Sequence, residues 1–162
     1  MKKLILLRHA KSSWENNLQD RERPLSEKGV STLNKVINGS REIFNSSDIV
    51  FVSPANRALH TASIMINLTK ISYKKLNVVE ALYTFNHIDI IKFIKKVDNI
   101  YNQVIIVGHN PAFTNTANFF SLSKDYYMST SSWVKIEFKT NDWTKIDKGI
   151  SSFGSRKTLN LK

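Results

Sequence analysis

The sequence predicts an α/β protein: a three-layer sandwich with a mostly parallel central sheet and an antiparallel hairpin near the C-terminus. Two observations support this fold class. Short apolar runs, typical of buried strands, alternate with segments whose apolar residues recur at helical spacing. Further along, two apolar runs, residues 133–138 and 143–146, flank a Thr-Asn-Asp turn. At 162 residues and 41% hydrophobic composition, the chain fits a single domain spanning residues 1–162.

The first half of the chain contributes two strands and two helices to this prediction. Residues 4–7 (LILL) form a first buried strand, and residues 48–53 (DIVFVS) form a second. Between them, residues 25–44 have apolar positions at roughly helical spacing, and Ser26 is a suitable N-cap. Pro54 then stands at the first position of another helix, where its missing N–H costs nothing. That helix continues through the apolar positions Ala58, Ala62, Met65 and Ile66.

The second half continues the alternation. Residues 75–79 form a weaker third strand, and residues 88–97 form a helix with one apolar face. Residues 104–109 (VIIVGH) are the clearest buried strand in the sequence. Residues 110–120, which begin with Asn-Pro, form the helix after it. Because strands and helices alternate, we expect the strands to lie parallel, with the last hairpin adding antiparallel strands.

Composition excludes several kinds of site. The chain has no cysteine, which excludes disulfides, zinc–thiolate sites and thiol catalysis. The apolar stretch in the first nine residues, MKKLILLRH, is too short for a signal peptide. No apolar segment is long enough to cross a bilayer. We therefore expect a cytoplasmic protein with no membrane partner. The formal net charge of +11 favours an anionic partner or reflects a general richness in lysine. Because the lysines are scattered, nucleic acid is not the expected partner.

Each predicted parallel strand is followed by residues that suit phosphate chemistry. Arg8 and His9 end the first strand, and Arg57 lies in the first turn of the helix after the second. Glu80 ends the third strand, and His109 ends the fourth. In open α/β sheets, ligands bind beyond the carboxyl ends of the strands. If the strands are parallel, these five side chains converge at one edge of the sheet.

Such a set of side chains suits phosphoryl transfer through a covalent intermediate. Arginine pairs with phosphate oxygens through two charge-assisted hydrogen bonds, and helix N-termini add backbone N–H groups. A neutral imidazole can attack phosphorus, and neighbouring arginines should lower its pKa and keep it unprotonated. A carboxylic acid can protonate the leaving group and later activate water. We therefore expect phosphoryl transfer that needs no metal and no cofactor.

Taken singly, these residues also have ordinary structural explanations. Arg8 alone is more simply explained as an arginine at a strand end, paired with a carboxylate. His9 alone is more simply explained as a core histidine whose hydrogen bonds are satisfied. Glu80 also has a simpler, less favoured explanation as an ordinary surface glutamate, because its strand is the weakest. The four histidines show neither an HxH nor an HExxH pattern, so a metal site is not expected.

Five segments, standing in order along the chain, resemble the histidine phosphatase superfamily, which includes the phosphoglycerate mutases. Within it they are most similar to the SixA-type phosphohistidine phosphatases. The segments are RHAKSSW (8–14), DRERPLSEKG (20–29), SPANRALHTA (53–62), VEALY (79–83) and VGHNP (107–111). The resemblance extends from Lys3 to about Phe120 and implies a phosphoglycerate mutase-like fold.

The resemblance also implies residue roles. His9 corresponds to the nucleophile that becomes transiently phosphorylated. Arg8, Arg57 and His109 correspond to the rest of the phosphate pocket, and Glu80 falls where relatives carry the proton donor.

Two positions depart from the superfamily pattern. Ala10 replaces the usual glycine, a change common in the SixA-type branch. Glu15 stands where the mutases carry an asparagine that touches the phosphate. A second carboxylate there would repel phosphate, which weakens a mutase assignment.

The expected substrate is phosphohistidine on a protein. Only residues 81–103 separate the third and fourth strands, which leaves room for a small lid and an open pocket, accessible to a phosphorylated side chain. The net charge of +11 fits an acidic phosphotransfer domain as the partner. One alternative is a phosphomonoesterase acting on a small phosphorylated metabolite. Another is a module that binds phosphoproteins without turnover.

Overall fold

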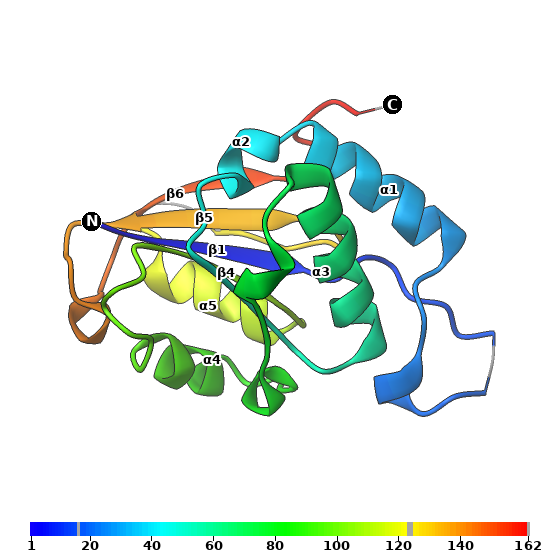
Figure 1. The fold of residues 1–162 in the computed structure, drawn as a ribbon, viewed down its shortest axis with the longest axis horizontal. Helices are drawn as coiled ribbons and strands as arrows, with labels where there is room; N and C mark the ends of the chain where they lie inside the picture. Colours follow the sequence, from blue (N-terminus) through cyan, green and yellow to red (C-terminus); the bar gives the residue numbers. More distant parts are fainter. Residues whose placement is uncertain (16, 123–124, 162) are drawn as a thin grey trace.

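A six-stranded mixed sheet forms the centre of the computed structural model, which describes residues 1–15, 17–122 and 125–161 (Figure 1). The strand order is β3-β2-β4-β1-β5-β6. The strands are β1 (Lys2–Arg8), β2 (Ile49–Val52), β3 (Leu76–Val78), β4 (Gln103–Gly108), β5 (Trp133–Phe138) and β6 (Ile150–Gly154).

The first four strands are parallel to one another, and the last two form an antiparallel pair. β4 lies between β1 and β2 and pairs in parallel with both. β5 pairs antiparallel with β1, and β6 antiparallel with β5. The carboxyl ends of β1, β2 and β4 therefore lie at the same edge of the sheet, where polar residues follow each strand.

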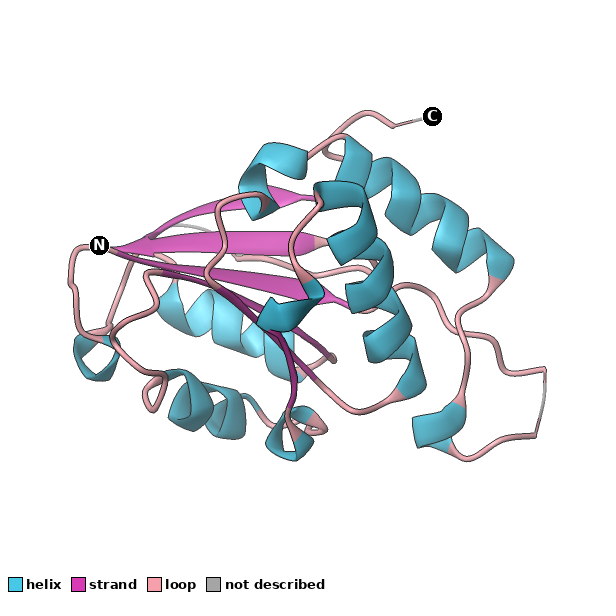
Figure 2. Cartoon of the chain, in the orientation of Figure 1, coloured by secondary structure: helices cyan, strands magenta, loops and turns pink. Residues whose placement is uncertain are grey.

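Helices cover both faces of the sheet, which gives the three-layer arrangement that the sequence predicts (Figure 2). Helices α1 and α3 pack on one face, and α4 and α5 on the other. The helices are α1 (Glu27–Asn38), α2 (Arg41–Phe44), α3 (Asn56–Thr69), α4 (His87–Ile94) and α5 (Ala112–Phe120). None of the helices in the described ranges is long and apolar enough to cross a membrane.

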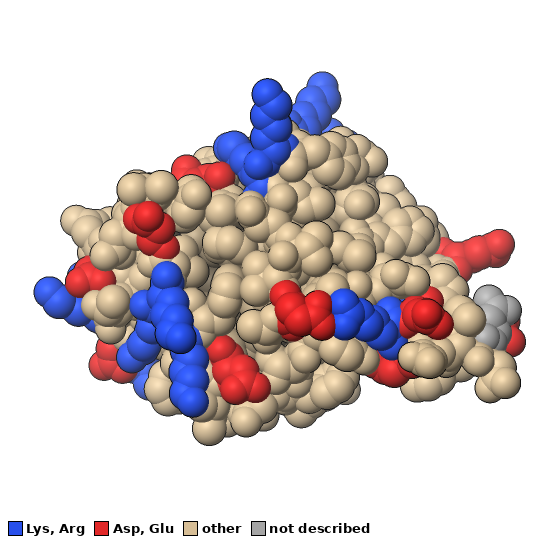
Figure 3. All heavy atoms as spheres, turned by 60° about the horizontal axis from the view of Figure 1, so that its bottom comes forward, with Lys and Arg blue, Asp and Glu red and all other residues tan. Residues whose placement is uncertain are grey.

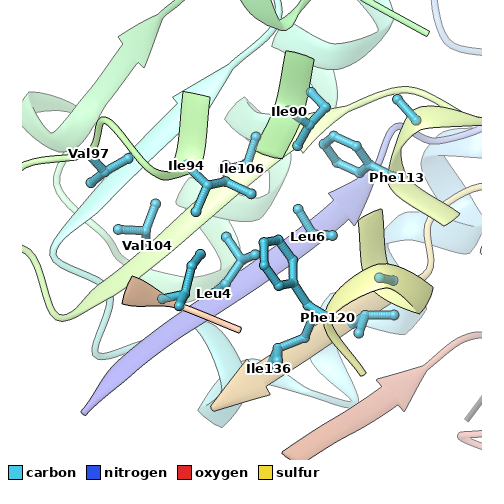
Figure 4. Close-up of a cluster of buried hydrophobic side chains, with 14 of the residues drawn as sticks. Leu4, Leu6, Ile90, Ile94, Val97, Val104, Ile106, Phe113, Phe120 and Ile136 are labelled. Carbon is cyan, nitrogen blue, oxygen red and sulfur yellow. The ribbon is translucent and has the colours of Figure 1, made fainter. Parts of the chain in front are cut away.

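Strand β1 divides its apolar side chains between the two layers because successive side chains point to opposite faces of a strand. Leu4 and Leu6 pack with α4 and α5 in the cluster drawn in Figure 4. Ile5 and Leu7 pack with α1 and α3 in a second cluster. All four are fully buried. This two-sided packing holds β1 firmly, so the residues directly after it have a well-defined position.

Two predicted elements differ from the observed ones. The helix predicted over residues 25–44 is divided at Gly39 and Ser40 into α1 and α2. The Ser40 hydroxyl donates to the Val36 carbonyl at 2.6 Å and accepts from the indole N–H of Trp133 at 3.0 Å. These two bonds hold Ser40 at the break between the helices.

The second strand of the predicted hairpin was misplaced. Residues 143–146, predicted as a strand, begin with a short 3-10 helix, Trp143–Lys145, and β6 follows at Ile150. Trp143 is fully buried and its indole N–H donates to the Tyr101 carbonyl at 2.9 Å. Its burial explains the apolar character of this segment without a strand.

The remaining boundaries shift by a few residues. α3 begins at Asn56 with Ala55 as its N-cap, so Pro54 precedes the helix rather than occupying its first position. Ser26 caps α1 as predicted, accepting from the Gly29 amide.

Candidate active site

The register of β1 and β4 places His9 beside His109. Arg8 lies opposite Gly108, and the His9 amide donates to the Gly108 carbonyl at 3.1 Å. The two imidazole rings that follow are 5.2 Å apart between centroids. Gly108 is required here because a Cβ atom would lie 2.7 Å from the Phe113 ring. Two histidines far apart in the sequence therefore lie side by side at the sheet edge.

The tautomer of His9 is set by a backbone hydrogen bond. Its Nδ1–H donates to the Ala10 carbonyl at 2.7 Å, so Nε2 carries the lone pair. The side chain is nearly buried, with 8% of its surface exposed. Burial, assisted by the positive charges of Arg57, Arg8 and Arg23, lowers the pKa of His9 to about 4. The imidazole is therefore neutral at pH 7, and its Nε2 is available as a nucleophile.

Arg57 connects His9 to a carboxylate that the sequence analysis did not single out. It is the second residue of α3 and is 2% exposed. Its Nε–H donates to His9 Nε2 at 3.4 Å. Its Nη1 donates to the Asp20 carbonyl at 2.5 Å, and Nη2 to the Asp20 carboxylate at 3.0 Å. Asp20 therefore fixes the orientation of the guanidinium next to His9 Nε2.

Asp20 is held by a second donor. The Tyr83 hydroxyl donates to the same carboxylate oxygen at 2.5 Å. Partial burial acts to raise the pKa of Asp20, but hydrogen bonds from Tyr83 and Arg57 and the nearby positive charges lower it overall. Asp20 is thus ionised at neutral pH and serves as an acceptor for these two side chains.

Nearly all the unpartnered buried polar atoms in the described residues lie at this site. They are Arg8 Nε, Arg23 Nε and Nη1, His109 Nδ1 and Ser131 Oγ. Ser131 adjoins the site because its amide donates to the His9 carbonyl at 3.2 Å. Arg23 Nε is 3.3 Å from Asp20 but lacks hydrogen-bond geometry. Since buried polar groups normally find partners, this concentration indicates a ligand site.

His109 can present an N–H group to an anion. Its Nε2 is 2.7 Å from the Ser53 hydroxyl, and its Nδ1 has no partner among the described residues. When Ser53 donates to Nε2, Nδ1 carries the proton and can donate to a phosphate oxygen. Burial, with the positive charges of its neighbours, lowers the pKa of His109 to about 3, so the ring is neutral at pH 7.

A cleft of about 290 Å³ opens above His9 and the arginines, and His109 is not among the described residues that line it. The side chains that line it are basic, polar and aromatic: Arg8, His9, Lys11, Ser12, Trp14, Asp20, Arg23, Arg57, Phe85, Asn110 and Thr130. Arg8, His9 and Arg57 are thus brought together as the sequence analysis expected, and His109 packs against His9.

Glu80, the expected proton donor, occupies a different place. Its carboxylate accepts two hydrogen bonds from Arg21, at 2.5 and 2.9 Å, and its side chain is 70% exposed. These bonds lower the pKa of Glu80. Glu80 is not among the described residues that line the cleft. Its role as a proton donor stays a prediction.

Arg23 and Asp20 are the site residues that sequence reasoning missed. Both lie in the segment between β1 and α1, which has no regular apolar pattern. A signal was nevertheless present, because both belong to DRERPLSEKG, one of the five segments that carry the family resemblance. In that segment Asp20 and Arg23 precede the start of α1, and Pro24 lies between them and the helix.

The two departures from the superfamily pattern are accommodated. Ala10 is fully buried and is not among the described residues with positive φ, so its Cβ is compatible with the backbone. Its amide donates to the Thr61 hydroxyl at 3.0 Å. Glu15 is exposed and is not among the described residues that line the cleft.

No group of three or more His, Asp or Glu side chains within the described ranges is arranged to hold a metal ion. The expectation of a reaction without metal or cofactor stays a prediction.

Comparison with known proteins gives a fold, and a match to a family model over part of the chain. Residues 4–82, close to half of the chain, match the model of the histidine phosphatase superfamily (branch 1). No curated protein sequence matches the chain. Among solved structures, the protein histidine phosphatase SixA complexed with tungstate aligns with a TM-score of 0.81 at 17% identity, covering 97% of this chain and 99% of that one.

Two further structures extend the comparison. A candidate phosphohistidine phosphatase SixA from Nakamurella multipartitia has a TM-score of 0.77 at 18% identity, with 95% of each chain covered. A mycobacterial glucosyl-3-phosphoglycerate phosphatase has a TM-score of 0.62 at 14% identity, covering 96% of this chain and 98% of that one. At these identities the likeness shows the fold, and it confirms the predicted phosphoglycerate mutase-like α/β architecture. The family match over residues 4–82 and this likeness both support the expected class of enzyme, a hydrolytic phosphatase.

Proposed function

We propose that residues 1–162 form one phosphatase domain that hydrolyses phosphohistidine on a protein through a phosphorylated His9. The observation that carries this proposal is the cluster of unpartnered buried N–H groups around a neutral histidine. Arg8, Arg23 and His109 provide donors for the oxygens of a phosphoryl group, and Arg57 adjoins the nucleophilic nitrogen. The location we expect is the cytoplasm.

In the first step, His9 Nε2 attacks phosphorus, and the bond between phosphorus and the substrate imidazole breaks. The substrate imidazole is already protonated on its other nitrogen, so it leaves as a neutral ring and requires no further proton. The new phosphoimidazolium on His9 keeps its Nδ1–H on the Ala10 carbonyl. The arginines balance the charge of the transferred group in the nearly buried site.

In the second step, water attacks phosphorus and the bond to His9 Nε2 breaks. The electron pair returns to Nε2, and the proton from water leaves with inorganic phosphate or to solvent. His9 thus regains the neutral tautomer that the Ala10 carbonyl favours. No group outside the site described here is needed to balance these two steps.

An acidic phosphotransfer domain is the partner that we propose. The formal net charge of +11 favours an anionic protein. Basic and acidic side chains are interspersed on the face drawn in Figure 3, without one continuous basic patch of the kind that binds nucleic acid.

The test is phosphate release from an acidic phosphotransfer domain phosphorylated on histidine. We expect wild type to release phosphate and His9→Ala to lose activity by roughly a thousandfold or more, since it lacks the nucleophile. His60→Ala is the matched control, because His60 is exposed on α3 and outside the cleft. An acid-labile phosphoenzyme trapped during turnover would exclude a module that only binds.

Other outcomes would contradict the proposal. Near-normal activity of His9→Ala would rule out the covalent mechanism. Hydrolysis of a small phosphomonoester by wild type, with no release from the phosphorylated domain, would assign a small-metabolite substrate instead.

A further inference from the structure

Two exposed aromatic side chains, Trp14 and Phe85, line the cleft, and a third, Tyr127, contacts Arg8; each thus interacts with a different residue of the phosphate site. Trp14, Phe85 and Tyr127 are 77%, 49% and 76% exposed. They come from three separate segments: the one after β1, the one before α4 and the one before β5. We call these three residues the aromatic rim.

The contacts of the rim lead directly to the phosphate-binding groups. The guanidinium of Arg23 lies over the Trp14 ring, 3.4 Å from its centroid. The Phe85 ring is 5.7 Å from the His109 ring. The Tyr127 side chain is hydrogen-bonded to the Arg8 side chain.

Exposed aromatic rings in this position are more typical of an interface than of a free surface. Trp, Tyr and Arg are enriched among the residues that contribute most to binding between proteins. Rings already ordered against a guanidinium or an imidazole lose little conformational freedom when they bind a partner. The rim thus combines apolar area with a low entropic cost.

We propose that the aromatic rim is the docking surface for the protein that carries the phosphorylated side chain. This inference rests on the proposed function. The cleft, at about 290 Å³, is at the small end of ligand pockets and accommodates little more than a phosphorylated side chain. The backbone and neighbouring side chains of the partner must then lie outside the cleft, against the rim.

The charge around the rim indicates the kind of partner. Lys11 is exposed at the cleft, and Arg8 and Arg23 also line it. Together with the net charge of +11, these cations favour an acidic protein surface with apolar side chains next to its phosphohistidine. The rings would contact the apolar side chains, and the cations would select the acidic surroundings.

The experiment compares two substrates that share a P–N bond. One is an acidic phosphotransfer domain phosphorylated on histidine, and the other is phosphoramidate, which carries no group large enough to reach the rim. The variants are Trp14→Ala, Phe85→Ala and Tyr127→Ala. Tyr73→Ala is the matched control, because Tyr73 is 50% exposed and lies just before β3, at the opposite edge of the sheet.

Each rim variant should lower kcat/KM for the phosphorylated domain roughly tenfold more than kcat/KM for phosphoramidate, as expected for the loss of one dominant interface residue. The difference should appear mainly in KM. Tyr73→Ala should leave the ratio of the two substrates unchanged. Equal losses on both substrates would overturn the inference, because the rings would then only support the phosphate-binding side chains.

Two further outcomes separate the inference from the function on which it rests. If wild type hydrolyses phosphoramidate but not the phosphorylated domain, the proposed function itself fails, whatever the variants do. If wild type hydrolyses the domain and the rim variants selectively lose activity on a nucleoside monophosphate instead, the rings stack on bases and the docking inference is wrong.

Discussion

Cationic nitrogens are buried at both ends of strand β1: the Lys2 ammonium group has hydrogen-bond acceptors, whereas the Nε atom of half-buried Arg8 has none among the described residues. At the amino end, Lys2 is fully buried, and its ammonium group donates to the carbonyls of Asn99 and Tyr101 and to the Asn102 side chain. At the carboxyl end, Arg8 Nε and two nitrogens of Arg23 are buried without partners among the described residues.

This difference separates a structural cation from a ligand-binding one. Burying a charge is unfavourable unless it is paired or fully hydrogen-bonded. Around Lys2 the protein provides the acceptors itself, so the cost is offset within the fold. At the site, Arg8 donates one bond to the Met128 carbonyl and Arg23 lies near Asp20, but three of their buried nitrogens lack acceptors, which phosphate oxygens would provide. Buried polar atoms without a hydrogen-bond partner therefore identify the position of the site better than the positions of the charged side chains do.

Replacing each cation by methionine gives the sharpest test of this contrast. Lys2→Met should lower the free energy of unfolding by about 3 kcal/mol, because it leaves buried acceptors without a donor, and should leave catalysis unchanged. Arg23→Met should lower kcat/KM roughly a hundredfold, as does the loss of one donor to a transition-state oxyanion. Its unfolding free energy should stay within about 1 kcal/mol of wild type, because the lost ion pair is balanced by removal of unpaired donors.

Urea unfolding and steady-state kinetics measure both effects. Inorganic phosphate should raise the melting temperature of wild type and of Lys2→Met but not of Arg23→Met. The contrast between the two ends would be lost if Arg23→Met kept this protection or if Lys2→Met were as stable as wild type.

The histidines at the site end predict how stability depends on pH. The pKa values of His9 and His109 are lowered to about 4 and about 3, below the ordinary value near 6.5. Between about pH 6.5 and 4, the unfolded chain therefore binds protons at these positions and the folded protein does not. The free energy of unfolding should fall with decreasing pH through this window, by at most about 1.4 kcal/mol per pH unit for each histidine.

Urea unfolding at pH 7, 6 and 5 measures this slope, above the range where carboxylates titrate. His109→Asn should remove about half of it. A free energy of unfolding that does not change from pH 7 to 5 would show that the two rings are not buried in their neutral forms.

Most of the fold and the centre of the site could be predicted because buried parallel strands appear in the sequence as continuous apolar runs. The apolar runs before His9 and His109 mark β1 and β4, and polar residues after such strands necessarily lie at one edge. The misplaced hairpin strand shows the limit of this reasoning. Apolar spacing reports burial, and the segment at Trp143 is buried without being a strand, whereas β6 (ISSFG) is mostly polar.

The roles of Asp20, Arg23 and Tyr83 could not be predicted for a different reason. They lie in irregular segments, and only tertiary contacts decide which charged loop residue turns toward His9. Arg21 and Arg23 are two positions apart in the same segment. One contacts Glu80 at the surface, and the other is buried at the cleft. No local pattern distinguishes them.

The smallest expected effects on catalysis distinguish the roles of the two carboxylates near the site, Asp20 and Glu80. Asp20→Asn should lower kcat roughly tenfold on both phosphohistidine and a phosphomonoester, because an amide holds the Arg57 guanidinium less firmly than a carboxylate does. Tyr83→Phe should have a smaller effect in the same direction, since Arg57 keeps its own bonds to Asp20. Glu80→Gln should change phosphohistidine hydrolysis by less than about threefold, because the leaving imidazole is already protonated.

The substrate pair makes this last comparison decisive. If Glu80 donates a proton to leaving groups, Glu80→Gln should slow hydrolysis of a phosphomonoester with a poorly acidic alcohol and spare phosphohistidine, whereas Asp20→Asn should slow both equally. A loss in Glu80→Gln that is equal on both substrates would mean that Glu80 acts through its contact with Arg21 rather than as an acid. If Asp20→Asn leaves kcat unchanged on both substrates, its carboxylate does not position Arg57, and the bond between Arg57 and the Asp20 backbone carbonyl is sufficient to hold the guanidinium against His9.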